Sequence, residues 1–420
     1  MPKFFFIKAQ QVLLILIILL LPSQLAWHYW PTIGLLKGVR IDYLAIRIYL
    51  VDCLLALLGI ISLGIFLAKK MPIRKVFTQS KLFICLFIFY ILIQGFWNPF
   101  GYLQLYYGIR FCLWMGFFLA IQRLALNNYK LAVIFILQIW FLCLLSLAQF
   151  LKGQSIGGML YYLGERYFTL STPGIAKAWF LNQVWLRPYA TFSHPNVLSA
   201  YLLLISAWLR FTPLTPRLEK IKFFSLIFGL VIILLAFSQT IWAAYLTIVL
   251  INHVDYSRLK KILGFRYFLP LFLSLVFFMP VLLLTLGVIY PIQAIAERNL
   301  ISLWFFSHYR EIILGSGWFG YQAWITQLRQ FKNFSLLLQP LHHGWWLAIY
   351  FVGLIPMALL VYFLKPLAWF KKISLKYMLI IGLILITGSF DHYYITQNQT
   401  LLLAVLMVAL ANKNFQNTAV

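Results

Sequence analysis

The sequence predicts an all-α integral membrane protein, and three observations lead to this prediction. First, 63% of the 420 residues are hydrophobic and only 10% are charged, whereas soluble domains carry about 25% charged residues. Second, the apolar residues form long continuous runs, not the short alternating segments of a membrane β-barrel. Third, almost all basic and acidic residues lie between these runs, as expected where polar loops join helices that satisfy their own backbone in lipid. Residues 1–420 are therefore interpreted as one polytopic membrane domain.

A helix needs about 20 mostly apolar residues to cross a bilayer, and the chain contains twelve candidate runs. The first resembles a signal peptide, but it lacks a small-residue cleavage motif and is interpreted as a retained helix. The seventh and eighth are short and meet at Ser238-Gln239-Thr240, so they form either tilted helices or one broken hairpin. The runs lie near 9–27, 48–68, 82–98, 104–122, 131–151, 196–211, 223–238, 239–252, 268–290, 343–363, 376–390 and 399–412.

The net charge of +26 predicts the orientation of these helices and not the binding of nucleic acid. With a cytoplasmic N-terminus, the inner segments carry 22 of the 34 Lys and Arg residues and the outer segments carry 11. This bias follows the positive-inside rule and places both termini in the cytoplasm. The inner basic clusters also suit contact with anionic membrane lipids. Arg110 remains within a predicted span, and the larger outer loops are then 152–195 and 291–342.

A polar run from Arg187 to Asn196 precedes the sixth apolar run and lies on the predicted outer side. Arginine offers a planar fork of donors that suits phosphate oxygens. Arg187 is therefore a candidate to hold an anionic group, with His194 and Asn196 as supporting residues at the mouth of the helix. The alternative is that Pro195 and Asn196 only begin a helix while Arg187 extends to lipid headgroups.

Histidines also gather on the predicted outer side. His342 and His343 begin the tenth run, and Asp391 and His392 lie in the last outer turn. Histidine titrates near neutral pH and can act as a general base, and an acid at a membrane surface is by default a site candidate. An interfacial aromatic belt and a plain polar turn are the structural alternatives. Adjacent histidines point apart and carboxylates are few, so no metal and no other cofactor is expected.

A third polar segment contains Arg298 and Arg310, followed by Gly315 and Gly317. If the segment is helical, arginines twelve residues apart share a face, because twelve is close to a multiple of 3.6. The two glycines would then end that helix. The alternative is an amphipathic surface helix with Glu–Arg pairs.

In this order, the motifs resemble the O-antigen ligase and O-antigen polymerase superfamily of bacterial envelope proteins. The resemblance covers about 24–412 and depends on Arg187…His194-Pro-Asn196, on Arg298 to Gly317, and on His342 to Gly353. It implies a helical glycosyltransferase of the lipid-carrier, GT-C-like type in the bacterial cytoplasmic (inner) membrane, with its active site on the outer face. The chain departs from the family pattern at Phe351, where the family often has Glu.

The resemblance also implies the reaction and the roles of the site residues. A glycan would pass, with inversion and without metal, from undecaprenyl diphosphate to a lipid or glycan acceptor. In a ligase the acceptor is the lipid A–core of lipopolysaccharide. Arg187 and a second arginine, either Arg298 or Arg310, would hold the donor diphosphate, and His342 would serve in catalysis.

Two other functions remain open at this stage. A polymerase of the same superfamily would pass the glycan to another lipid-linked repeat of a surface polysaccharide. A flippase or exporter of lipid-linked glycan belongs to a different class and is expected to show charged or broken helices and an internal repeat. The sequence offers only Arg110 and the break at Ser238-Gln239 for that class, and no repeat.

Overall fold

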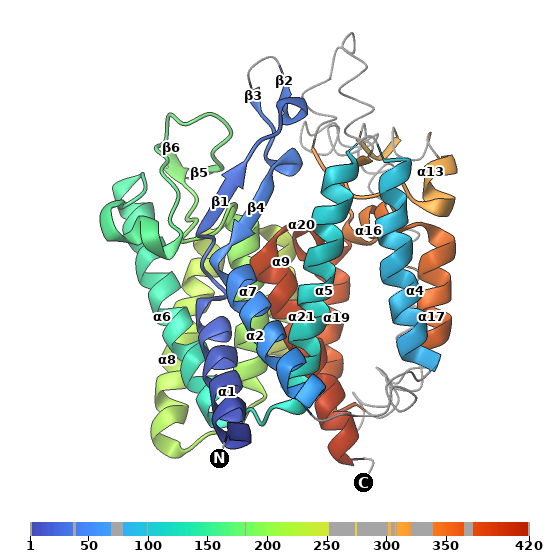
Figure 1. The fold of residues 1–420 in the computed structure, drawn as a ribbon. Helices are drawn as coiled ribbons and strands as arrows, with labels where there is room; N and C mark the ends of the chain where they lie inside the picture. Colours follow the sequence, from blue (N-terminus) through green and yellow to red (C-terminus); the bar gives the residue numbers. More distant parts are fainter. Residues whose placement is uncertain are drawn as a thin grey trace.

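The computed structural model describes residues 2–36, 39–68, 79–98, 100–180, 182–251, 274, 301–303, 307, 309–320, 339–364 and 373–418. This part of the chain is mostly helical. The helices run side by side, with both termini at one end and the short strands at the opposite end (Figure 1). This arrangement agrees with a membrane bundle that carries both termini at one end and its larger loops at the other.

Three helices in the described part are long and apolar enough to cross a membrane, and a bent pair adds a fourth if it counts as one span. The three are α2 (Leu50–Ala68), α5 (Gly101–Arg123) and α6 (Asn128–Lys152). At a rise of about 1.5 Å per residue, a 25-residue helix such as α6 extends about 37 Å, which exceeds the hydrocarbon thickness of about 30 Å. A membrane-embedded helical protein is thus supported.

The other helices of the bundle overlap the remaining predicted apolar runs, except for 268–290, of which only residue 274 is described. They are α1 (Pro2–Leu20), α4 (Gln79–Ile93), α7 (Pro195–Arg210), α8 (Pro216–Leu235), α9 (Gln239–Ile251), α16 (Gly344–Val352), α17 (Leu354–Leu364), α19 (Leu375–Gly388) and α21 (Asn398–Thr418). The break near Ser238 separates α8 from α9, as the sequence predicted.

Helix α7 is the most enclosed element of the bundle. Every residue from Val197 to Leu209 is buried, and α7 contacts α6, α8, α9, α19 and α21. A helix that is apolar on all sides needs neighbours on all sides. The polar residues just before α7 therefore join a helix that its neighbours hold on several sides.

Three two-stranded antiparallel ribbons lie in the segments that were predicted to be outer loops, and the all-α prediction did not include them. The pairs are β1 (Ala26–Tyr29) with β4 (Ile46–Tyr49), β2 (Leu35–Leu36) with β3 (Val39–Arg40), and β5 (Lys177–Phe180) with β6 (Gln183–Leu186). Short 3-10 helices accompany them, namely η1 (Thr32–Gly34), η2 (Asp42–Leu44) and η4 (Gly158–Leu163). Each ribbon satisfies backbone groups where the chain reverses between helices.

The predicted run 343–363 is not one continuous helix. Helices α16 and α17 meet at an angle of 99°, and the residue between them, Gly353, has a φ of +103°. A Cβ on Gly353 would approach the carbonyl carbon of Leu314 to 2.5 Å and the nitrogen of Gly315 to 2.8 Å. Only glycine permits this backbone conformation and this close approach.

The backbone groups released by this break are satisfied from elsewhere in the fold. Backbone nitrogens of Ser316 and Gly317 donate to the carbonyls of Tyr350 (2.8 Å) and Phe351 (3.1 Å) at the end of α16. The side-chain amide of Gln94, in the 3-10 helix η3 (Gln94–Phe96), also donates to the Phe351 carbonyl at 3.1 Å. Irregular backbone at membrane depth is tolerated when protein groups replace water in this way.

Arg110, the one basic residue predicted inside a span, belongs to a buried ion pair. Its Nε lies 3.6 Å from Oδ2 of Asp52, and the two side chains are 5% and 7% exposed. Asn398 accepts a hydrogen bond from Arg110 Nη2 and donates to Asp52 Oδ1 at 3.4 Å. Because the charge is paired and hydrogen-bonded, it links α2, α5 and α21 without leaving a lone ion in the bundle.

Candidate functional site

The candidate site lies at the N-terminal end of α7, at the end of the bundle opposite the two termini. Pro195 occupies the first turn of α7, where a missing N–H costs nothing. His194 is the residue before it, and its Nδ1 accepts a hydrogen bond from the backbone nitrogen of Asn196 at 3.1 Å. His194 therefore caps the helix and fixes the position of Asn196 in the first turn.

Arg187 connects the β5–β6 ribbon to this end of the bundle. Its Nε donates to the carbonyl of Ala236 at 2.7 Å, and its Nη2 donates to Oδ1 of Asn196 at 2.7 Å. Ala236 follows the last residue of α8, so the guanidinium also satisfies a carbonyl at the negative end of that helix. Burial lowers the pKa of Arg187, and Tyr189 and Asp391 raise it, yet a guanidinium remains charged at any physiological pH.

Asn196 in turn bonds to Asp391, which lies 195 residues further along the chain. The Asn196 amide nitrogen donates to Oδ2 of Asp391 at 3.2 Å. Asp391 sits in the turn between α19 and the short helix α20 (Tyr393–Thr396). The N-terminal end of α7 and the turn between α19 and α20 are thereby held together by a line of side-chain hydrogen bonds that begins at Arg187.

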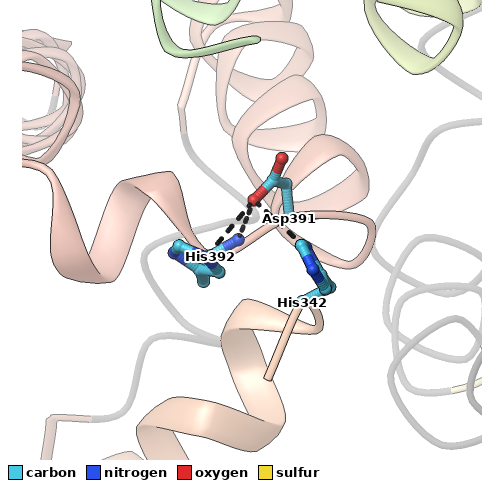
Figure 2. A group of neighbouring side chains, drawn as sticks. All are labelled: His342, Asp391 and His392. Atoms are coloured by element: carbon cyan, nitrogen blue, oxygen red, sulfur yellow. Dashed lines mark hydrogen bonds and ion pairs between the residues drawn. The ribbon is translucent and has the colours of Figure 1, made fainter. Parts of the chain in front are cut away.

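The second carboxylate oxygen of Asp391 faces two histidines (Figure 2). Oδ1 lies 4.0 Å from Nδ1 of His342 and 3.9 Å from Nε2 of His392. It also accepts a hydrogen bond from the backbone nitrogen of His392 at 2.8 Å. The other ring nitrogen of His392, Nδ1, lies 2.7 Å from Oγ1 of Thr396, which fixes the plane of this ring. Asp391 is thus oriented by Asn196 on one side and placed beside two imidazoles on the other.

Close packing of glycine brings His342 to this carboxylate. Gly344 begins α16 two residues after His342, and a Cβ on Gly344 would approach the carbonyl oxygens of Gly388 and Asp391 to 2.9 and 3.0 Å. A side chain there would push the start of α16 away from the turn that carries Asp391. The sequence Pro340-Leu-His-His-Gly344 therefore folds the two histidine segments against one another.

His343 has a structural task that its neighbour does not share. It is buried, and its Nδ1 accepts a hydrogen bond from the backbone nitrogen of Trp346 at 3.3 Å, which caps the N-terminus of α16. Of the adjacent pair, His342 therefore faces Asp391, whereas His343 holds the helix that positions it. This division agrees with the prediction that adjacent histidines point apart.

The two remaining predicted arginines cannot be placed at this site. Arg310 belongs to helix α13 (Tyr309–Leu314), of which the backbone is described but not the Arg310 side chain. Arg298 lies outside the described residues. The choice between them as the second phosphate ligand stays a prediction. Arg187, in contrast, contacts the cluster through Asn196.

The ligand atoms of His342, Asp391 and His392 all lie within 4.8 Å of one another, which is the spacing of a possible metal site. Nitrogen and oxygen ligands on one zinc ion lie roughly 3.3 Å apart, because each is about 2.0–2.1 Å from the metal. The two nitrogen-to-oxygen distances here, 4.0 and 3.9 Å, are longer than that and longer than a hydrogen bond, so the carboxylate acts on the two rings through its charge. The predicted absence of a metal stays a prediction, and chelation tests it.

Sequence reasoning missed some residues that shape the site. The ring of Tyr43, in η2, lies edge-on to the ring of His392 at a centroid distance of 6.3 Å. Ser193 donates to the side chain of Gln397 at 2.8 Å, which joins the two outer turns a second time. The spacing of four residues between His392 and Thr396 was visible in the sequence. No pattern in the sequence indicated the contacts of Tyr43 and Gln397.

No family model, no curated protein and no solved structure matches this chain.

Proposed function

We propose that this protein is a membrane glycosyltransferase of the O-antigen ligase type. In this proposal it transfers a glycan from undecaprenyl diphosphate to a lipid or glycan acceptor at the outer face of the bacterial cytoplasmic membrane. The observation that supports it best is the continuous array from Arg187 through Asn196 and Asp391 to His342. One end of this array is a phosphate-binding type of side chain, and the other is a histidine beside a carboxylate.

The proposed topology has twelve spanning helices with both termini in the cytoplasm. The position of both termini at one end of the bundle supports it, as does the position of the ribbons and of the short helix α20 toward the other (Figure 1). The 22-to-11 distribution of Lys and Arg adds the orientation. With this orientation, the site opens toward the side on which a lipid-linked donor presents its sugars.

The proposed donor half of the reaction uses Arg187. Its Nε and Nη2 donate to Ala236 and Asn196, and these two bonds fix the guanidinium. Its third nitrogen, Nη1, bonds to no described residue and would bind a phosphate oxygen. The diphosphate is the leaving group, and fixed cations stabilise the charge it gains as the bond to the sugar breaks. Arg298 or Arg310 would supply the second cation.

The proposed acceptor half uses His342. An acceptor hydroxyl oxygen attacks the anomeric carbon, the bond from that carbon to the diphosphate oxygen breaks, and the electron pair leaves with the diphosphate. The hydroxyl proton passes to His342. Because Nδ1 of His342 faces Asp391, Nε2 is the nitrogen that would take the proton, and the carboxylate stabilises the imidazolium that forms. Direct displacement inverts the anomeric centre.

A lipid-linked glycan flippase is the second candidate, and the 99° break between α16 and α17 favours it. Transporters often place broken helices at their binding sites. The Arg110–Asp52 pair does not add to this candidate, because both charges are satisfied within the bundle.

Reconstitution distinguishes these functions. Purified protein in liposomes receives lipid-linked glycan with or without a lipid A–core acceptor, and the products are separated by size. Glycan on the acceptor indicates a ligase, and chain growth without acceptor indicates a polymerase. Movement of the glycan across the bilayer without a new glycosidic bond would replace the proposal with the flippase. His342→Ala is the matched control, because it should abolish bond formation while donor binding persists.

A further inference from the structure

A pocket with a volume of about 320 Å³ lies beside the site, between the β1–β4 ribbon and the predicted outer loop 152–195. The ribbon register pairs His28 with Arg47 and Ala26 with Tyr49. Residues directly opposite in an antiparallel pair share one face, and so do residues two apart on a strand. These four side chains therefore belong to one face of the ribbon, and all four line the pocket.

Three side chains that line this pocket carry buried N–H donors that make no well-aligned hydrogen bond to a described residue, although Arg47 also lies within reach of the Tyr107 hydroxyl. These donors are Gln24 Nε2, Trp30 Nε1, and both Nε and Nη2 of Arg47. Arg47 is only 7% exposed. Native proteins rarely leave such groups unsatisfied, and each exception needs an explanation. Because every one of these atoms is an N–H donor, the missing partner is a ligand rich in acceptors.

The charges around the pocket also favour an anion at Arg47. Asp42 and Glu165 are the carboxylates of the lining, yet neither lies within 4.0 Å of a described arginine nitrogen as an ion pair. Glu165 instead accepts hydrogen bonds of 2.7 Å from Gln149 and from the backbone of Ile156 and Gly157. A buried guanidinium without a carboxylate partner is ready to bind an oxyanion.

The rim of the pocket has the composition of a sugar-binding surface. Tyr161 and Tyr167 line it and are 60% and 84% exposed, so their rings are available for the apolar face of a sugar ring. Arg166 also lines it and donates from Nη1 to the carbonyl of Ser193 at 3.2 Å. Aromatic rings at the mouth and donors at the base together suit a sugar that carries a negative charge.

The pocket adjoins the proposed catalytic site through two residues. Ser193 and Gln397 line it and bond to each other at 2.8 Å. Ser193 directly precedes His194, and Gln397 lies five residues after His392. A glycan whose reaction centre lies at His342 would therefore extend other sugars toward this pocket.

We propose that this pocket binds the carboxylate or phosphate group of a charged sugar within the glycan substrate, with Arg47 as the principal ligand. The proposal rests on the proposed function for its source of glycan, but the binding itself does not require transfer. The substrate class is then an acidic glycan. An anionic lipid headgroup offers the same oxyanion chemistry and is the alternative source that the experiment separates.

Binding is measured on the full-length protein that carries His342→Ala, so that no turnover interferes. The protein is held in nanodiscs of phosphatidylcholine, and the probe is a glucuronate disaccharide, with a glucose disaccharide as the neutral control. Calorimetry reports binding for the parent protein and for every variant. We expect glucuronate to bind and glucose to bind at least about tenfold more weakly, the value of one charge-assisted contact.

Two variants assign the binding to the pocket. Arg47→Gln should weaken glucuronate binding at least about tenfold, and Arg123→Gln, in the last turn of α5, is the matched control that should not change it. Because Arg47 is buried, its variant can also lose the fold. Trp30→Phe keeps an aromatic ring, although a smaller one, and removes the N–H, and it should weaken glucuronate binding by a few-fold with an unchanged melting temperature.

The outcomes separate the sources and the two proposals. Glucuronate binding that Arg47→Gln and Trp30→Phe both weaken supports the inference, even if the reconstituted protein proves not to transfer glycans. Equal binding of glucose and glucuronate, or no effect of either variant, overturns it while leaving transfer intact. Loss of glucuronate binding in nanodiscs that contain phosphatidylglycerol, with the same dependence on Arg47, would assign the pocket to lipid headgroups and overturn the inference as well.

Discussion

At the residue scale, the site is organised by Asp391, whose two oxygens serve different partners. Oδ2 accepts from Asn196, and Oδ1 lies beside His342 and His392. This division places a single negative charge between the proposed phosphate-binding arginine and the proposed base. A carboxylate in that position stabilises the protonated form of the imidazole through its charge.

Replacing Asp391 with Asn should separate these two tasks. The amide retains the shape and can still bond to Asn196, but it removes the charge that stabilises a protonated His342. We expect the transfer rate at saturating donor to fall about 100-fold or more, with donor binding unchanged. The check is the rate and the donor affinity in the same detergent preparation. A fully active Asp391→Asn variant would show that the carboxylate has no role in proton transfer.

Arg187→Lys tests the geometry of the guanidinium and not its charge. Arg187 makes two bonds of 2.7 Å in different directions, to Ala236 and to Asn196, and one ammonium on a flexible stem cannot reproduce that fork. Transfer should fall about 100-fold, and the free energy of unfolding should fall by about 1–2 kcal/mol. Rates and thermal unfolding are measured together. Near wild-type transfer would mean that Arg187 is only an interfacial residue.

Chelation tests the predicted absence of a metal at His342, Asp391 and His392. The 4.0 and 3.9 Å separations exceed the spacing of ligands on one zinc ion, so transfer should persist in excess EDTA. The transfer rate is followed before and after dialysis against the chelator. Loss of activity that one divalent ion restores would convert the cluster into a metal site and remove His342 as the base.

At the element scale, the bend between α16 and α17 depends on the contact between Gly353 and the segment at Gly315. Gly353→Ala would place a Cβ 2.5 Å from the Leu314 carbonyl carbon, at a φ of +103°. We expect a loss of about 2–4 kcal/mol in the free energy of unfolding. Gly59→Ala, in α2, is the control, because a Cβ there meets nothing within 4 Å. The stability of both variants is compared by thermal aggregation in detergent. Equal stability would show that the bend tolerates a side chain at position 353.

The sequence predicted the helices far better than it predicted their interruptions. Long apolar runs identify helices because lipid leaves the backbone no other partner, and this holds for α2, α5 and α6. The same apolarity hides the bend at Gly353, since hydropathy does not depend on φ. The ribbons were also missed, because strands as short as Leu35–Leu36 have no periodicity to detect.

The site was predicted in pieces that the sequence could not assemble. Arg187, His342 and Asp391 were each selected for their chemistry and their predicted side of the membrane. The hydrogen bond from Asn196 to Asp391 spans 195 residues, and a single sequence contains no signal for such a pairing. The Arg47 pocket was missed for a related reason, because an arginine in a loop looks ordinary until its donors are found buried.

At the scale of the whole molecule, the proposed topology is tested by labelling. Tyr167, which is 84% exposed, lies on the predicted outer side, and Lys220, near the start of α8, lies on the inner side. In a variant without the four native cysteines, Tyr167→Cys should react with an impermeant thiol reagent in intact cells, whereas Lys220→Cys should react only after lysis. The reverse pattern would place the site in the cytoplasm, away from lipid-linked glycans.

The enclosure of α7 has a consequence for biogenesis. Ribosomes add about 5–20 residues per second, so Asp391 is synthesised about 10–40 seconds after Asn196, given their separation of 195 residues. During that interval α7 has been made, but α19 and α21, which cover it, have not. The nascent chain therefore contains Arg187 before it contains Asp391. The site forms only when the segment that carries Asp391 has been made and packed against α7. Premature termination before residue 391 would leave a membrane-inserted chain that has no assembled centre.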